Sequence, residues 1–226
     1  MTNTWERRDF IALILIPLLM VARWAAEPLS LFASSAVIFT LTLASTLVLI
    51  RLYRDLLAKD WAAFRRKLWL KVLICIVGVV AIFGVLTVAR MVLPIRDVAE
   101  VNGYGGTSAE IAAVFSILFA FIPLFIAFQE EVILRHVLFF KHRGNKALAI
   151  ALFFISAFLF GLIHINSFGG DLLSTVPYMF VGAFFNLLYL LSKNIWFVLV
   201  THLLFNFLMA FLPAVLVPIM LMLRGI

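Results

Sequence analysis

Residues 128–140, FQEEVILRHVLFF, place charged side chains inside a long apolar run. The run begins upstream with IAAVFSILFAFIPLFIA and ends downstream at the basic turn KHRGNK, residues 141–146. A charge at the centre of a membrane-spanning helix costs about 2.5–3.5 kcal/mol on insertion scales. We therefore expect Glu130, Glu131 and Arg135 to face the interior of a helix bundle, where each has a partner or a chemical task.

The composition indicates an integral membrane protein. The chain has 226 residues, of which 65% are hydrophobic and 13% charged, and its mean hydropathy is +1.18. A soluble domain is about half apolar and about a quarter charged, so this chain has too little polar surface to cover a water-soluble globule. Its net charge of +7 lies in short segments between apolar runs, a pattern that favours membrane orientation and not nucleic-acid binding.

The apolar runs predict an all-α polytopic bundle of about eight spanning helices. We expect one integral membrane domain over residues 1–226, with a motif-bearing core at about 110–212. About 20 residues are needed to cross the hydrocarbon region. The runs lie near residues 9–26, 31–50, 69–93, 110–139, 147–165, 172–191 and 195–212, with a shorter eighth run at 214–223.

The basic residues predict the orientation, because Lys and Arg concentrate on the cytoplasmic side of membrane proteins. If the N-terminus is cytoplasmic, the segments on that side collect most of the 18 Lys and Arg. The opposite side then holds Arg96 and Arg90. Eight spans would place both termini in the cytoplasm, and the compact chain favours a prokaryotic cell membrane. The predicted cytoplasmic set is Arg7, Arg8, Arg51, Arg54, Lys59, Arg65, Arg66, Lys67, Lys71, Lys141, Arg143, Lys146, Lys193 and Arg224.

Three polar motifs lie within the apolar runs. In EExxxR, Glu131 and Arg135 are four residues apart on one helix face and can pair, whereas Glu130 is rotated by about 100° and faces elsewhere. The other two motifs are FxxxH, which ends at His164, and HxxxN. In HxxxN, His202 and Asn206 share one face. Taken singly, each motif is equally explained by packing: an ion pair that holds a helix, a hydrogen-bonded histidine, or an interhelical amide contact.

Together the motifs carry a carboxylate, two histidines and an amide on three helices, which are parts suited to activating water and holding an oxyanion. Their order resembles the CAAX protease and bacteriocin-processing family, also called the Abi family, which includes the type II prenyl-protein endopeptidases. The resemblance runs from about Phe128 to Asn206.

The resemblance implies an intramembrane endopeptidase that acts on a peptide or protein substrate at the lipid bilayer. By matching positions, Glu130 would be the general base, and His164 would help to bind and orient the attacking water. His202 and Asn206 would donate hydrogen bonds to the oxyanion, while Glu131 and Arg135 would support the site.

Alternatives to this function remain open. Two histidines and a glutamate are a possible zinc set, but HExxH is absent, so we expect a reaction without a metal or cofactor. A non-proteolytic membrane scaffold or a bacteriocin self-immunity protein could retain the same residues. A proton-coupled transporter is disfavoured because no inverted repeat is visible.

Overall fold

The computed structural model describes residues 5–93, 115 and 117–223, which form helices and no strand. The all-α membrane bundle is therefore confirmed. Within these ranges, six helical segments are long and apolar enough to span a membrane, and a seventh, α7, is apolar but shorter. The helices are α1 (Arg7–Ala26), α2 (Leu31–Leu52), α3 (Arg54–Phe64), α4 (Leu68–Val92), α6 (Ile122–Glu130), α7 (Lys146–Leu162), α8 (Leu172–Ser192), α9 (Ile195–Asn206) and α10 (Leu212–Leu223).

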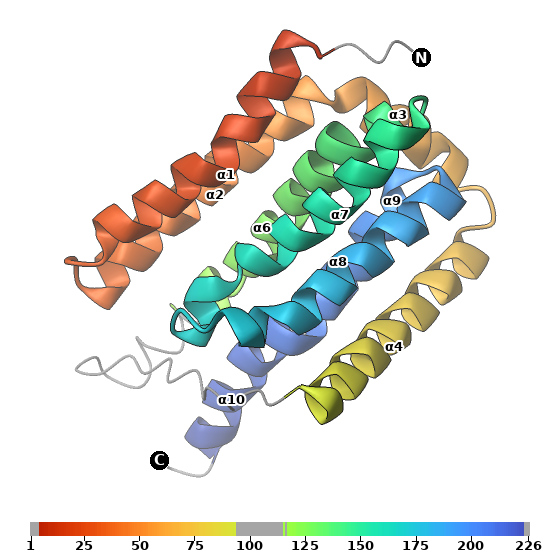
Figure 1. Cartoon of the computed structure of the whole chain (residues 1–226). Helices are drawn as coiled ribbons and strands as arrows, with labels where there is room; N and C mark the ends of the chain where they lie inside the picture. Colours follow the sequence, from red (N-terminus) through yellow and green to blue (C-terminus); the bar gives the residue numbers. More distant parts are fainter. Residues whose placement is uncertain (1–4, 94–114, 116, 224–226) are drawn as a thin grey trace.

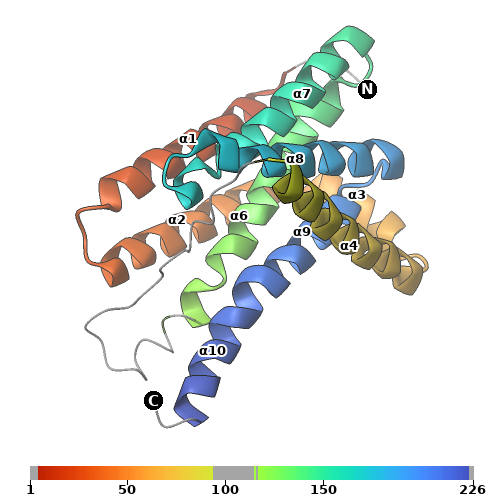
Figure 2. The same ribbon diagram turned by 60° about the horizontal axis from the view of Figure 1, so that its bottom comes forward.

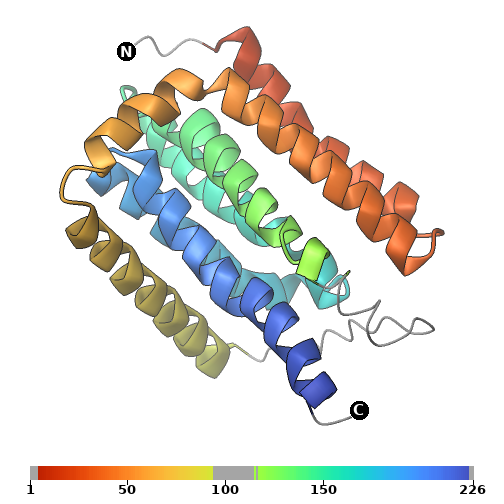
Figure 3. The same cartoon turned by 180° about the vertical axis from the view of Figure 1, so that it is seen from behind.

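The central segment changes its helical type at the charged motif. α6 continues directly into a π-helix, η1 (Glu131–Phe139), which is followed by a short 3₁₀ turn, η2 (Phe140–His142). They make up most of the candidate span Ile117–His142. Half of the most apolar 18-residue stretch of this span is buried inside the bundle, the largest share among the six candidate spans. α6 lies between α2 and α9 (Figure 3). This central position explains how charged side chains are removed from lipid.

The predicted eighth span is wrong, because it continues the seventh. α9 runs through a second π-helix, η4 (Phe207–Phe211), into α10 without an intervening loop, and Figure 2 shows α9 and α10 in one line. Consequently, α1 begins at one end of the bundle and α10 ends at the other (Figure 1). The arrangement does not support two termini on the same side.

Most of the basic segments nevertheless gather at one end, which we call the basic end. It contains the start of α1, all of α3, the turn between η2 and α7, and the junction of α8 with α9 (Figure 1). Arg224, which the sequence assigned to this set, lies outside the described residues. The loop that carries Arg96 lies outside the described residues.

α3 is an additional short helix that the apolar runs did not predict. Its Asp60 carboxylate accepts a hydrogen bond from the backbone N–H of Ile195 at 2.9 Å, and the Asp60 carbonyl accepts one from the Asn194 side chain at 2.7 Å. The first N–H groups of a helix lack intrahelical partners. Asp60 therefore caps α9 and fixes the start of the helix that carries His202.

Candidate active site

The Glu131–Arg135 ion pair expected from the sequence is present and fully buried. The Arg135 Nε donates to Glu131 Oε2 at 3.1 Å, and neither side chain is exposed. The Arg135 Nη1 also donates to the Ser156 hydroxyl at 3.1 Å, and its guanidinium lies 4.4 Å from the centre of the Phe160 ring. Arg135 is thus held by an anion, a hydroxyl and an aromatic face.

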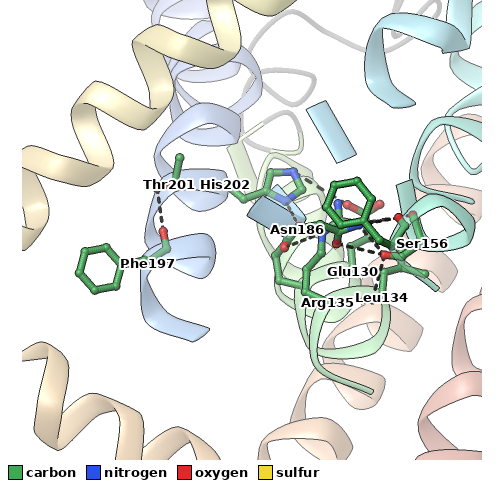
Figure 4. Close-up of polar contacts among 10 residues, drawn as sticks. Glu130, Leu134, Arg135, Ser156, Asn186, Phe197, Thr201 and His202 are labelled. Atoms are coloured by element: carbon green, nitrogen blue, oxygen red, sulfur yellow. Dashed lines mark hydrogen bonds and ion pairs between the residues drawn. The ribbon is translucent and has the colours of Figure 1, made fainter. Parts of the chain in front are cut away.

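Ser156 connects this ion pair to α7 and α8. Its hydroxyl donates to the Leu134 carbonyl at 2.9 Å and lies 3.3 Å from Asn186 Oδ1, while the Asn186 amide donates to the Phe153 carbonyl at 2.8 Å (Figure 4). Leu134 lies in the π-helix, a geometry that is frequent at functional sites. Sequence reasoning missed Ser156, because a lone serine in an apolar run carries no distinguishing pattern.

His202 lies between the two glutamates. Its Nδ1 is 2.9 Å from Glu131 Oε1, and its Nε2 is 3.9 Å from Glu130 Oε2. The Glu131 carboxylate, paired with Arg135, can only accept, so Nδ1 carries the proton and donates. Nε2 is then left facing Glu130 across a gap too long for a direct hydrogen bond. The sequence did not predict the contact between Glu131 and His202, which lie 71 residues apart.

Glu130 has different surroundings from its neighbour. Its side chain is 7% exposed and lines a cavity of about 120 Å³ between α1, α2, α6 and the turn after α7. Among the residues that the structure describes, none donates a hydrogen bond to its carboxylate. One carboxylate is therefore committed to two partners, and the adjacent one is left facing a cavity.

His164 is connected to His202 through Phe160, which contacts both. Its Nδ1 donates to the Phe160 carbonyl at 2.7 Å, and its ring stacks on Tyr178 with centroids 4.6 Å apart. The Phe160 ring in turn lies 5.6 Å from the His202 ring. The bond at Nδ1 leaves Nε2 of His164 as an acceptor. Within the described chain, no hydrogen bond or ion pair joins His164 to Glu130 directly.

Two glycines allow α7 and α8 to approach closely beside Phe160 and His164. A Cβ atom added at Gly161 would lie 2.9 Å from the Thr175 carbonyl oxygen, and one added at Gly182 would lie 2.9 Å from the Ala157 carbonyl oxygen. Small residues at helix contacts are a recurrent means of packing in membranes. In the second motif, Phe160 therefore supplies the ring that contacts Arg135. Gly161, the next residue, allows the close approach of α7 and α8 that holds this ring in place.

Asn206 makes a contact that the sequence did not predict. Its Nδ2 donates to the Pro123 carbonyl at 3.0 Å, which joins α9 to the first turn of α6. An amide nitrogen has two N–H groups, so one remains for another acceptor. The structure thus brings Glu130, Glu131, Arg135 and His202 into direct proximity, while His164 and Asn206 flank them with bonds to neighbouring backbone.

His202 and His164 each keep Nε2 as a potential metal ligand, because their Nδ1 atoms bind Glu131 and the Phe160 carbonyl. The described ranges nevertheless contain no group of three or more His, Cys, Asp or Glu side chains placed to hold a metal. Among the described residues, Glu130 Oε2 and His202 Nε2 lie 3.9 Å apart. This arrangement does not fit a zinc set of three protein ligands.

Comparison with known proteins supports the family resemblance. Residues 112–208 match the family model described as "Type II CAAX prenyl endopeptidase Rce1-like". This segment contains all three motifs, so the resemblance inferred from them is confirmed. No curated protein and no solved structure matches the chain.

Proposed function

We propose that this Rce1-like chain is an intramembrane endopeptidase in which Glu130 is the general base. The family match supports a peptide hydrolase of the CAAX type, embedded in the membrane. The observation that carries the assignment to Glu130 is its carboxylate at the cavity, 3.9 Å from His202 Nε2. Glu131, by contrast, is already bound to Arg135 and His202.

In the proposed reaction, a water in the cavity gives a proton to Glu130 and attacks the carbonyl carbon of the peptide bond. Nε2 of His164 accepts a hydrogen bond from this water and orients it. Collapse of the tetrahedral intermediate breaks the C–N bond, and Glu130 returns the proton to the leaving amine. The products are a carboxylic acid and an amine, so atoms and protons balance.

His202 and Asn206 stabilise the negative oxygen in this proposal. A neutral His202 with its proton on Nδ1 cannot donate from Nε2, so it serves as a donor only as the imidazolium. Glu131, 2.9 Å from Nδ1, accepts the hydrogen bond from Nδ1 and fixes the orientation of the ring. Asn206 donates through the amide N–H that does not bind Pro123. Donors placed where charge develops in the transition state are usually the largest catalytic contribution.

The basic end is proposed to face the cytoplasm of a prokaryotic cell. The observation that favours this orientation is the clustering of Lys and Arg there. The N-terminus is then cytoplasmic, and α10 ends on the opposite side.

The test compares peptide termini in membranes that contain the wild-type chain or Glu130→Gln. Glu27→Gln, in the exposed turn between α1 and α2, is the matched control. We expect cleavage to create substrate peptide termini that are present with the wild type and the control but absent with Glu130→Gln. Purified chain is then assayed with a quenched farnesylated CAAX peptide and its non-prenylated copy. Identical termini with all three chains, and no cleavage of either peptide, would favour the scaffold or immunity role instead.

A further inference from the structure

The cavity in front of Glu130 extends toward the end of the bundle that lacks the basic segments. α1 runs away from the basic end, and Arg23 lies in its last turn. α6 runs the other way, so Ile122 at its start is also far from the basic end, and Asn166 follows the far end of α7. Arg23, Ile122 and Asn166 all line the cavity. They mark its outer part, and Glu130 its inner part.

The opposite route, from the basic end to Glu130, is filled with side chains. Val137, Phe140 and Tyr189 are all at most 5% exposed, and the Phe140 and Tyr189 rings stack with centroids 3.9 Å apart. Beyond them, Lys141 pairs with Asp9, which also accepts a hydrogen bond from the Tyr53 hydroxyl at 2.9 Å. These contacts bind the start of α1 to η2 and close that end.

The chemistry of the lining indicates the kind of ligand. The walls are largely apolar and include Ile16, Ile122 and Ile126, whereas the outer part carries the Arg23 guanidinium. No ion pair joins Arg23 to a carboxylate in the described part of the chain. An apolar peptide segment with an acidic group therefore fits in one direction, with the acidic group at Arg23.

We propose that the substrate enters the site from the end opposite the basic end, with an acidic group bound by Arg23 at the mouth of the cavity. The inference rests on the proposed function, since it concerns the substrate of the same site. It assigns the substrate to the non-cytoplasmic side of the membrane, including the outer half of the bilayer. Arg23 is then a specificity-determining residue on α1, a helix outside the matched family segment.

Single cysteines test the side of entry without any need for catalysis. In a Cys75→Ser chain, Ile126→Cys reports the cavity and Asn166→Cys its mouth, while Lys193→Cys reports the basic end. Each cysteine variant is treated with a membrane-impermeant methanethiosulfonate reagent that carries a sulfonate group, in intact cells and in inside-out vesicles. We expect Ile126→Cys and Asn166→Cys to react in intact cells, and Lys193→Cys in inside-out vesicles alone. Reaction of Ile126→Cys only from the vesicle side, or from neither side, overturns the proposal.

Matched peptides test the role of Arg23. An apolar hexapeptide with one terminal glutamate and its glutamine copy are compared as protectors of Ile126→Cys from labelling. The glutamate peptide should protect at about two- to fivefold lower concentration, the range of a partly exposed ion pair. Arg23→Gln should remove this difference. Arg90→Gln should retain the difference. Arg90 is an exposed arginine in the last turn of α4, at the same end of the bundle as Arg23.

Equal protection by the two peptides, or protection by neither, contradicts binding of an acidic group at Arg23. All labelling is repeated in Glu130→Gln, where the expected pattern is unchanged because entry does not depend on the base. Cleavage that requires Glu130, combined with labelling from the cytoplasmic side only, would leave the proposed function standing and refute the route of entry.

Discussion

Glu130 and Glu131 are adjacent in sequence, yet the fold gives them opposite surroundings. Glu131 is fully buried between Arg135 and His202, while Glu130 faces a cavity and retains free acceptor capacity. A step of one residue along a helix rotates the side chain by about 100°. At the residue scale, this rotation separates the proposed base from a carboxylate that binds Arg135 and His202.

The two glutamates should respond differently to conversion into glutamine. Glu130→Gln keeps the volume and removes the base, so cleavage should fall by about 10²–10⁴-fold while the fold survives. Glu131→Gln leaves Arg135 without a carboxylate partner, and breaking a buried pair costs about 3–5 kcal/mol. That variant should melt earlier but retain more activity per folded molecule. Thermal midpoints in detergent and quenched-peptide cleavage measure both effects, and a stable, inactive Glu131→Gln beside an active Glu130→Gln would reverse the assignment.

Ser156→Ala tests the support of Arg135. The change removes the hydroxyl that accepts from Arg135 and donates to the Leu134 carbonyl. Leaving a buried polar group without its partner costs about 1–3 kcal/mol, so the thermal midpoint should drop. Ser34→Ala is the control, because that hydroxyl bonds only a carbonyl of its own helix. Equal midpoints for the two variants would show that the Ser156 contacts contribute nothing to stability.

At the scale of elements, two π-helical segments of the described chain lie at these motifs, one within EExxxR and one directly after HxxxN. η1 begins at Glu131, and η4 begins immediately after Asn206. A π-turn frees a carbonyl from the regular i to i−4 pattern, and neighbouring side chains then supply the missing donor. Ser156 does this for Leu134. The local geometry of the site therefore depends on hydrogen bonds from adjacent helices.

Asp60, outside the spanning segments, links α3 to α9 and should make stability depend on pH. Burial raises the pKa of its carboxyl above the usual range, so the folded chain binds this proton more tightly than the unfolded chain. Stability is then lost as the pH rises from about 4, near the ordinary Asp pKa, through the raised value. Asp60→Asn keeps an acceptor for the Ile195 N–H without the charge. The thermal midpoint of the wild type should fall relative to Asp60→Asn over this range.

The opposite trend, with the wild type gaining stability relative to Asp60→Asn as the pH rises, would contradict this prediction. It would mean that attraction between the carboxylate and the N-terminus of α9 outweighs burial.

At the scale of the whole molecule, one end is basic and closed, and the cavity lies toward the other. Lys141, Asp9 and Tyr53 form a bonded cluster at the basic end, and Arg23 lines the part of the cavity farthest from that end. Glu130, the proposed base, therefore lies between a packed half and a cavity-bearing half of the bundle.

Fusion proteins test the placement of the two ends of the chain. Because α9 and α10 form one continuous segment, a reporter after Leu223 should lie on the side opposite an N-terminal reporter. Alkaline phosphatase attached there should be active and green fluorescent protein dark, whereas N-terminal green fluorescent protein should fluoresce. A bright C-terminal green fluorescent protein would restore the original expectation of two cytoplasmic termini.

The sequence by itself determined the all-α membrane bundle, the ion pair between Glu131 and Arg135, and the three motifs. These features are local or compositional: apolar length sets the spans, and a four-residue spacing places two side chains on one helix face. The run at 214–223 was expected to be a separate eighth span, but it continues the preceding helix, since the apolar character of two adjacent runs does not reveal whether the helix ends between them.

Only the tertiary structure decided which partners the motif residues take. His202 bonds Glu131, Asn206 bonds the Pro123 carbonyl, and Ser156 supports Arg135, all across distances in sequence that no periodicity encodes. The cavity beside Glu130 likewise arises from four separate segments. Such contacts depend on how helices tilt and pack against each other, and that geometry is set by the whole set of side chains between them.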